Sequence, residues 1–150
     1  MARILRRWLQ LSGPERWLLL EAVAWNLVAR TGLSICSFQR LVRFLRRFHR
    51  AGAPPEGVEL PDFCEWAVAA ASRYVPRSTC LSRSLALQTM LGRRGLGSEL
   101  RIGVSRDGKL PLDAHAWVEW NGRKLLEGGE IERYSEMPGL NARLNKDRSP

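Results

Sequence analysis

The stretch of chain that most restricts the fold is residues 78–95, whose sequence STCLSRSLALQTMLGRRG predicts a helix. Ser78 or Thr79 can supply the side-chain oxygen that caps the unpaired amide groups of a first turn, so a helix start here has a physical cause. The leucine-rich middle predicts that most of this helix is buried. Gly92 and Gly95 mark its end, because glycine accepts the left-handed backbone of a helix C-terminus.

This helix carries Cys80 in its first turn. The unpaired N–H groups and the positive pole of a helix N-terminus stabilise a thiolate, and the thiolate is the nucleophilic form of cysteine. A free cysteine on a buried helix is more often a small packing residue. The functional interpretation therefore depends on whether the chain also supplies a base and a group that orients the base.

Both groups occur in a predicted β-hairpin. Residues 114–120 alternate, with His115 and Trp117 on one face, and the Asn-Gly pair at 121–122 is the strongest short hairpin signal. A two-residue loop pairs position 120 with 123 and 116 with 127, which predicts that the Glu127 carboxylate lies close to the His115 imidazole. Thiol, imidazole and carboxylate are the parts of a nucleophile, its base and the group orienting that base.

Length and cysteine content limit the remaining choices. A chain of 150 residues with 45% hydrophobic residues suits one compact domain, or a small catalytic domain with an appendage. Three cysteines at irregular spacing without a CxxC pair indicate neither a disulfide framework nor a zinc site, and two histidines are too few for a histidine-based site. We therefore expect no cofactor and no metal, and a reducing, cytoplasmic location.

The charge is unevenly distributed. Residues 1–50 contain ten arginines against two glutamates, whereas residues 51–150 are nearly neutral, so most of the net charge of +9 lies at the N-terminus. Helices are expected at 14–30 and 33–50, joined by a turn at Thr31-Gly32 into an antiparallel hairpin. Their apolar run is interrupted by polar residues and is too short to span a bilayer.

Three interpretations of this basic hairpin stay open. It is a lid packed on the catalytic domain with its arginines in solvent, a docking surface for a partner protein or acidic peptide, or a surface for membrane or nucleic acid. No nucleic-acid motif accompanies the charge, so we expect no nucleic-acid partner, and we do not predict a membrane partner.

The resulting organisation has three parts. We predict a basic helical region at 1–52, a catalytic core at 58–140 and a polar tail at 141–150, with a Gly/Pro linker between the first two. Within the core a helix begins near residue 60, and an alternating strand runs over 98–105. The fold class is α+β, with the cysteine helix packed on a small antiparallel sheet.

The block from residue 74 to about 137 resembles the transglutaminase-like branch of the papain-fold cysteine enzymes. There a cysteine, a His-Ala-Trp-Val-Glu segment and an acidic residue after a hairpin occur in that order. Within the branch it resembles the B-type leader peptidases of lasso-peptide biosynthesis. The closer match is carried by three segments of this chain: STCLSRSLAL at 78–87, LRIGV at 100–104 and AHAWVE at 114–119.

The resemblance implies specific roles. Cys80 matches the family nucleophile and His115 the family base. Glu127 stands where the family usually has aspartate, and Asp113, two residues before His115, is the reserve candidate for the same role.

The function implied is that of a cysteine peptidase that removes the leader from a ribosomally synthesised lasso-peptide precursor. An ATP-dependent cyclase then joins the freed N-terminus to a side-chain carboxylate. Some pathways fuse the peptidase to a winged-helix leader-binding module, and this chain has no spare segment for one, so we expect a separate leader-recognition protein. Two alternatives remain: transglutaminase or deamidase acyl transfer, and an inactive peptide-binding adaptor of the same fold.

Overall fold

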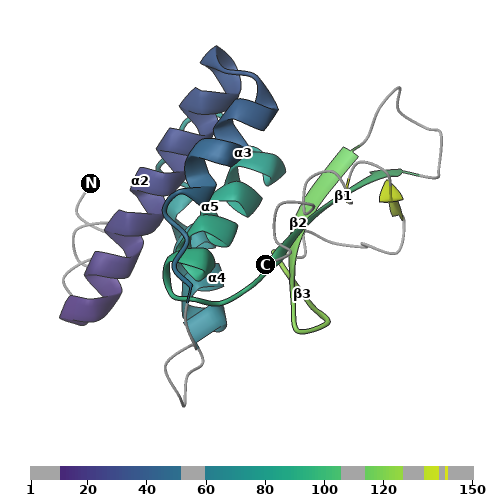
Figure 1. The fold of residues 1–150 in the computed structure, drawn as a ribbon. Helices are drawn as coiled ribbons and strands as arrows, with labels where there is room; N and C mark the ends of the chain where they lie inside the picture. The colour runs from purple at the N-terminus through teal and green to yellow at the C-terminus, as the bar shows by residue number, and fades with distance from the viewer. Residues whose placement is uncertain (1–10, 52–59, 106–113, 127–133, 139–140, 142–150) are drawn as a thin grey trace.

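The computed structural model describes residues 11–51, 60–105, 114–126, 134–138 and 141. Within them, four helices form one layer and a four-stranded antiparallel sheet lies beside it (Figure 1). The predicted α+β class is confirmed. The elements, in chain order, are α2 (Gly13–Ile35), α3 (Phe38–Arg46), α4 (Leu60–Ala71), α5 (Cys80–Arg93), β1 (Glu99–Ser105), β2 (Ala114–Trp120), β3 (Arg123–Leu125) and β4 (Tyr134–Glu136).

Helix α2 begins as the sequence predicted and ends later. The Ser12 side chain accepts a hydrogen bond from the Glu15 amide, and the Glu15 carboxylate accepts one from the Ser12 amide at 2.7 Å, which is a capping box. The predicted turn at Thr31-Gly32 is wrong, because the helix continues through it. Gly32 instead allows close packing, since a Cβ there would lie 2.4 Å from a methyl carbon of Leu41 on α3.

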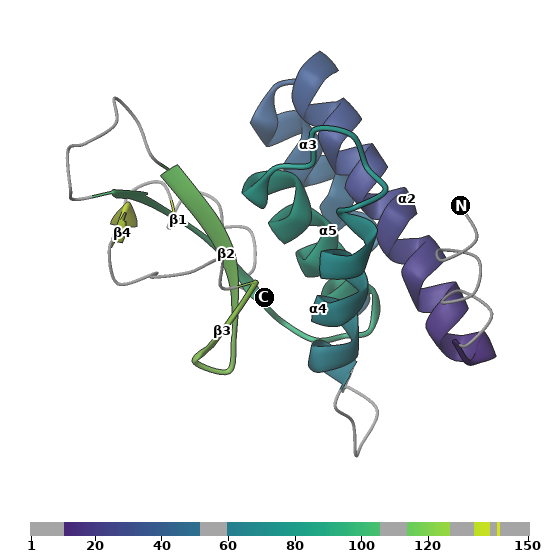
Figure 2. The ribbon, with the colours of Figure 1, turned by 180° about the vertical axis from the view of Figure 1, so that it is seen from behind.

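Helix α2 is the one helix of the described part long and apolar enough to cross a membrane by length and composition. Its buried side is nevertheless occupied by protein: Leu19 and Ala22 join one core cluster with residues of α4 and α5, and Ala29 joins a second with α3 and α5. Seen from behind, α2, α4 and α5 lie side by side (Figure 2). One side of α2 therefore packs against α3, α4 and α5. The predicted boundary near residue 52 stays a prediction.

The sheet has the order β3-β2-β1-β4. The Asn-Gly hairpin is present: Asn121 and Gly122 have φ of 48° and 75°, and Trp120 pairs with Arg123 as predicted. The ladder then stops at Leu125, because Leu126 has a left-handed φ of 62°. The predicted continuation of this strand through residue 126 is therefore wrong, and Glu127 lies outside the described residues.

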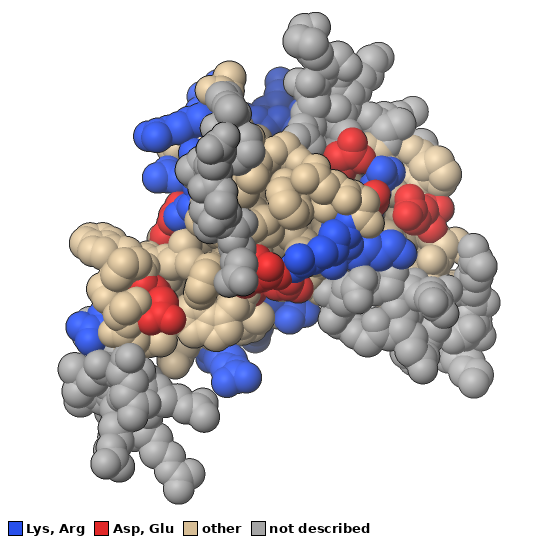
Figure 3. Space-filling model, turned by 90° about the horizontal axis from the view of Figure 1, so that it is seen from below, with Lys and Arg blue, Asp and Glu red and all other residues tan. Residues whose placement is uncertain are grey.

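Contacts with α4 explain this change of direction. The Leu126 amide donates a hydrogen bond of 2.6 Å to the Glu65 carboxylate on α4. Arg123, in β3, forms ion pairs with Asp62 and Glu65 of the same helix. On the face seen from below, basic and acidic side chains lie beside one another (Figure 3). Carboxylates of α4 thus bind the β3 side of the hairpin.

The fourth strand was not predicted. β4 pairs with β1 near the C-terminal end of the predicted core, where the sequence indicated no strand. Asn141 adds a buried amide whose oxygen accepts a hydrogen bond of 3.0 Å from the Ile102 amide. Residues 106–113 and 142–150 lie outside the described residues.

We predict that Gly32→Ala destabilises the protein and that Gly13→Ala does not. The new methyl group at position 32 meets the buried Leu41 side chain, and such overpacking costs about 1–3 kcal/mol, whereas nothing lies within 4 Å of a Cβ at position 13. Urea unfolding followed by circular dichroism measures both free energies. Equal stability of the two variants would contradict the close packing of α2 on α3.

Candidate active site

Cys80 is the first residue of α5, and the turn that precedes it is firmly capped. Thr79 is the N-cap: its hydroxyl accepts a hydrogen bond of 3.1 Å from the Ser82 amide, and the Ser82 hydroxyl accepts one of 3.0 Å from the Thr79 amide. The helix start predicted from Ser78 and Thr79 is confirmed. The Cys80 side chain is partly exposed, so an attacking thiol at this position has access to a ligand.

Helix α2 fixes this turn from the other side. The side-chain oxygen of the fully buried Asn26 accepts hydrogen bonds of 3.1 Å from both the Ser78 and Ser82 hydroxyls. One turn further along α2, the Arg30 guanidinium donates a hydrogen bond of 2.9 Å to the carbonyl of Arg77, a residue with a left-handed φ of 55°. Side chains of α2 therefore hold the backbone that leads into Cys80.

On the sheet side, the first turns of α5 lie along the part of the β2 edge that β3 does not pair with. In the ladder, the carbonyls of Ala116 and Ala114 face the side on which β3 pairs, and β3 ends before it reaches them. The Ser84 hydroxyl donates a hydrogen bond of 3.0 Å to the Ala116 carbonyl. The Cys80 sulfur lies 3.9 Å from the Ala114 carbonyl oxygen. The thiol is therefore held beside the residue that directly precedes His115.

His115 is the second residue of β2 and is only 8% exposed. Its ring lies 5.3 Å from the Tyr134 ring and 6.3 Å from the Trp117 ring, measured between centroids. Trp117 is fully buried and covers Gly103 of β1, where a Cβ would come within 3.1 Å of the indole. Aromatic rings from two strands therefore fix the place of the imidazole.

The two candidates for orienting the imidazole, Glu127 and Asp113, lie outside the described residues. The acidic residue that is described on the same strand has another partner: the Glu119 carboxylate accepts a hydrogen bond of 3.1 Å from Arg101. Arg101 also pairs with Glu99 at 2.7 Å. Glu119 is therefore part of an ion-pair cluster on β1 and β2.

The other two cysteines differ from Cys80. Cys64 is fully buried on α4, and burial raises the pKa of its thiol to about 11, so it is an uncharged packing residue. Cys36 is exposed at the end of α2. The described residues contain no group of three or more His, Cys, Asp or Glu that could hold a metal ion.

A family model described as transglutaminase-like superfamily matches residues 23–138, about three quarters of the chain. The chain belongs to the transglutaminase-like superfamily. Members of this superfamily are usually cysteine proteases or acyl transferases, and the position of Cys80 fits that general chemistry. No curated protein and no solved structure matches the chain. The match begins within α2, upstream of the block in which we located the motif.

Sequence reasoning missed the residues that surround Cys80 and His115 in this transglutaminase-like chain. Asn26 and Arg30 were assigned to the basic helical region outside the predicted core, and Tyr134 lies in a part of the core for which no strand was predicted. One signal was available: Asn26 is a polar residue within an otherwise apolar run, and a buried amide needs partners. The sequence does not indicate which residues those partners are, because Ser78 and Ser82 lie more than 50 positions away.

We predict that iodoacetamide labels Cys36 and Cys80 in the folded protein and leaves Cys64 unmodified. Thiolate is the reacting form, and burial keeps Cys64 protonated and covered. Mass spectrometry of tryptic peptides measures each site. Urea should make all three cysteines reactive, and native labelling of Cys64 at the rate of Cys36 would contradict the packing of α4.

We also predict that Asn26→Leu slows alkylation of Cys80, measured in a Cys36→Ser background. The substitution removes the acceptor for Ser78 and Ser82, so the first turn of α5 loses its fixed orientation. Asn141→Leu is the matched control, because it removes another buried amide, one whose hydrogen bond goes to Ile102 on β1, and each change should cost about 1–3 kcal/mol of stability. Equal Cys80 rates in both variants would contradict a positioning role for Asn26.

Proposed function

We propose that this chain is a cysteine peptidase that removes the leader from a ribosomally made lasso-peptide precursor. The observation that carries the proposal is the position of Cys80. It begins a helix whose N-terminus has a capping box, and its sulfur lies beside the carbonyl of Ala114, the residue that precedes His115 on β2. Superfamily membership supports the thiol chemistry. The closer assignment rests on the sequence segments around Cys80, β1 and His115.

In the proposed mechanism the Cys80 thiolate attacks the carbonyl carbon of the scissile peptide bond. Unpaired N–H groups in the first turn of α5 stabilise the oxyanion that forms. The tetrahedral intermediate collapses, His115 gives its proton to the leaving amine, and a thioester between Cys80 and the leader remains. The imidazole then takes a proton from water, whose attack on the thioester releases the leader carboxylate and restores the thiol.

The proposal includes partners of defined chemistry. The substrate is a precursor whose leader has threonine at its next-to-last position, and a separate leader-recognition protein presents it. The product is a core peptide with a free N-terminal amine, which is what an ATP-dependent cyclase needs for amide formation. All of these steps would take place in the cytoplasm.

Acyl transfer is the second candidate, because the superfamily to which the chain belongs also contains transferases. The thioester on Cys80 is the same intermediate, and the outcome depends on whether an amine or water attacks it. Attack of Cys80 on a glutamine side chain would release ammonia without cutting the peptide. The products therefore distinguish the two activities.

We predict that Cys80→Ala abolishes leader removal and that Cys36→Ser retains it. Cys80 is the nucleophile in the proposal, whereas Cys36 is exposed at the end of α2 and is not part of the proposed site. His115→Ala should slow cleavage by about a hundredfold or more, the usual contribution of a general acid and base. Mass spectrometry of the precursor, with and without the leader-recognition protein, measures the products.

Other results would replace the proposal. Ammonia release from an intact peptide would establish deamidation, and binding without any chemical change would establish the adaptor. If Cys80-dependent cleavage is found, the variants Glu127→Gln and Asp113→Asn are compared. Only substitution of the residue that orients the imidazole should reduce the rate of cleavage.

A further inference from the structure

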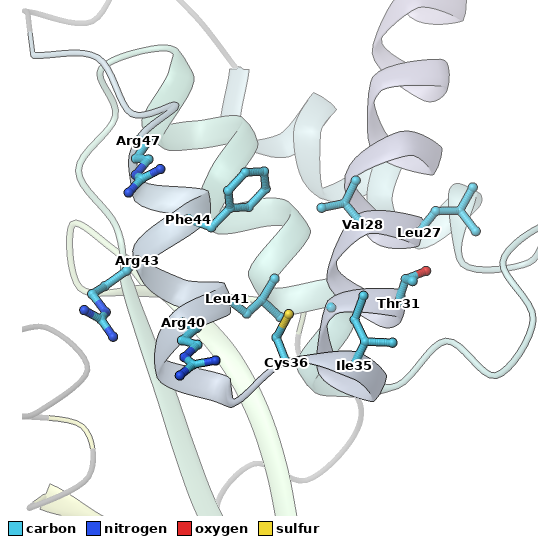
Figure 4. A pocket seen from close by; sticks show the side chains of 11 residues that line it. Leu27, Val28, Thr31, Ile35, Cys36, Arg40, Leu41, Arg43, Phe44 and Arg47 are labelled. Carbon is cyan, nitrogen blue, oxygen red and sulfur yellow. The ribbon is translucent and has the colours of Figure 1, made fainter.

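A groove of about 780 Å³ lies between the C-terminal half of α2 and helix α3. Its α2 wall is aliphatic and its outer margin on α3 is basic (Figure 4). None of the residues that cap Cys80 or form β2 lines it. The lining residues are Leu27, Val28, Thr31, Gly32, Ile35, Cys36, Arg40, Leu41, Arg43, Phe44 and Arg47.

Several apolar side chains that line this groove are exposed. Ile35 is 76% exposed, and Leu27 and Phe44 are each 44% exposed. In Figure 4, Phe44 and Leu41 project from α3 toward α2. Grouped exposed apolar side chains in a concave surface indicate a binding site, whereas single exposed ones carry no such meaning.

The basic margin has a helical repeat. Arg40, Arg43 and Arg47 follow one another at spacings of three and four, so they form a row along two turns of α3, about 10 Å long. All three are exposed, and none forms an ion pair with a described residue. No acidic residue is among the lining of the groove. The margin therefore presents uncompensated positive charge beside an apolar floor.

We propose that this groove binds an amphipathic helix of a partner polypeptide, with aliphatic side chains on one stripe and acidic side chains on the next. The aliphatic stripe covers the α2 wall, and the acidic stripe, which repeats at the same spacing of three and four, pairs with the arginine row. The proposal rests on α2 and α3 and is independent of the proposed peptidase activity.

Other occupants fit less well. A second copy of this chain, docked symmetrically, would bring two arginine rows together, and like charges repel. The N-terminal residues 1–10 carry three arginines and no acidic residue, so they have the wrong charge. An anionic bilayer attracts arginine, but an amphipathic surface that lies on a bilayer inserts an apolar face, and here the apolar side chains line a hollow.

The test uses the Cys80→Ala protein, so that binding is measured without cleavage, and two labelled designed peptides. Both carry leucine at every third or fourth position, and the adjacent stripe is glutamate in one peptide and lysine in the other. Fluorescence anisotropy should detect binding of the glutamate peptide, weakened by salt, and at least about tenfold weaker binding of the lysine peptide.

Matched variants locate the site. Arg43→Glu and Arg40→Glu should each weaken binding of the glutamate peptide by about tenfold. Arg73→Glu, which changes an exposed arginine outside the groove, should not weaken it. Ile35→Ser should also weaken binding, and Trp17→Ser should not, although both side chains are 76% exposed on the same helix. These residues are exposed, so circular dichroism should confirm that each variant folds.

The opposite results overturn the proposal. Absence of binding, or equal binding of the two peptides, would remove the charge complementarity on which it depends. Binding to phosphatidylglycerol vesicles that is lost in Arg43→Glu and Ile35→Ser, without peptide binding, would assign the groove to a membrane. Self-association that Ile35→Ser abolishes would assign it to a second copy.

Discussion

The rest of the site depends on the packing of α5 against α2, which is fixed by polar contacts at both ends. At one end the Glu21 carboxylate on α2 pairs with Arg93 at 3.0 Å and with Arg94 at 2.6 Å. At the other end Asn26 binds the hydroxyls of the first turn of α5. Apolar packing supplies most of the association, but it is not directional, whereas hydrogen bonds and ion pairs have defined geometry. The polar ends therefore set the register of α5, and with it the position of Cys80.

A second constraint comes from the early end of β3. A strand edge presents unpaired carbonyl groups, and proteins cover such edges with other elements. Here α5 covers the edge, because Ser84 binds the Ala116 carbonyl and Cys80 lies beside that of Ala114. The left-handed backbone at Leu126 directs the chain toward Glu65 on α4 and away from this edge. Cys80 thus lies along the part of the β2 edge that a longer β3 would pair with.

Local signals in the sequence predicted the elements that carry the candidate site. The cap before Cys80, the Asn-Gly hairpin and the alternation around His115 depend on neighbouring residues, so they were predictable. Three features were not: the continuation of α2 through Gly32, the strand β4, and the role of Asn26. Each depends on packing against another element: on Leu41 of α3, on β1, and on Ser78 and Ser82 respectively.

Helix α2 contributes side chains both to the candidate active site and to the α2–α3 groove. Its buried Asn26 and its Arg30 contact the turn before Cys80, and the neighbouring Leu27 and Val28 line the α2–α3 groove. A helix moves largely as a unit, because each of its turns is hydrogen-bonded to the next. Coupling between the groove and Cys80 would therefore pass through α2, and by linkage it would act equally in both directions on binding. Arg43 on α3 lies on the other wall of the groove, so its substitution leaves the helix that positions Cys80 unchanged.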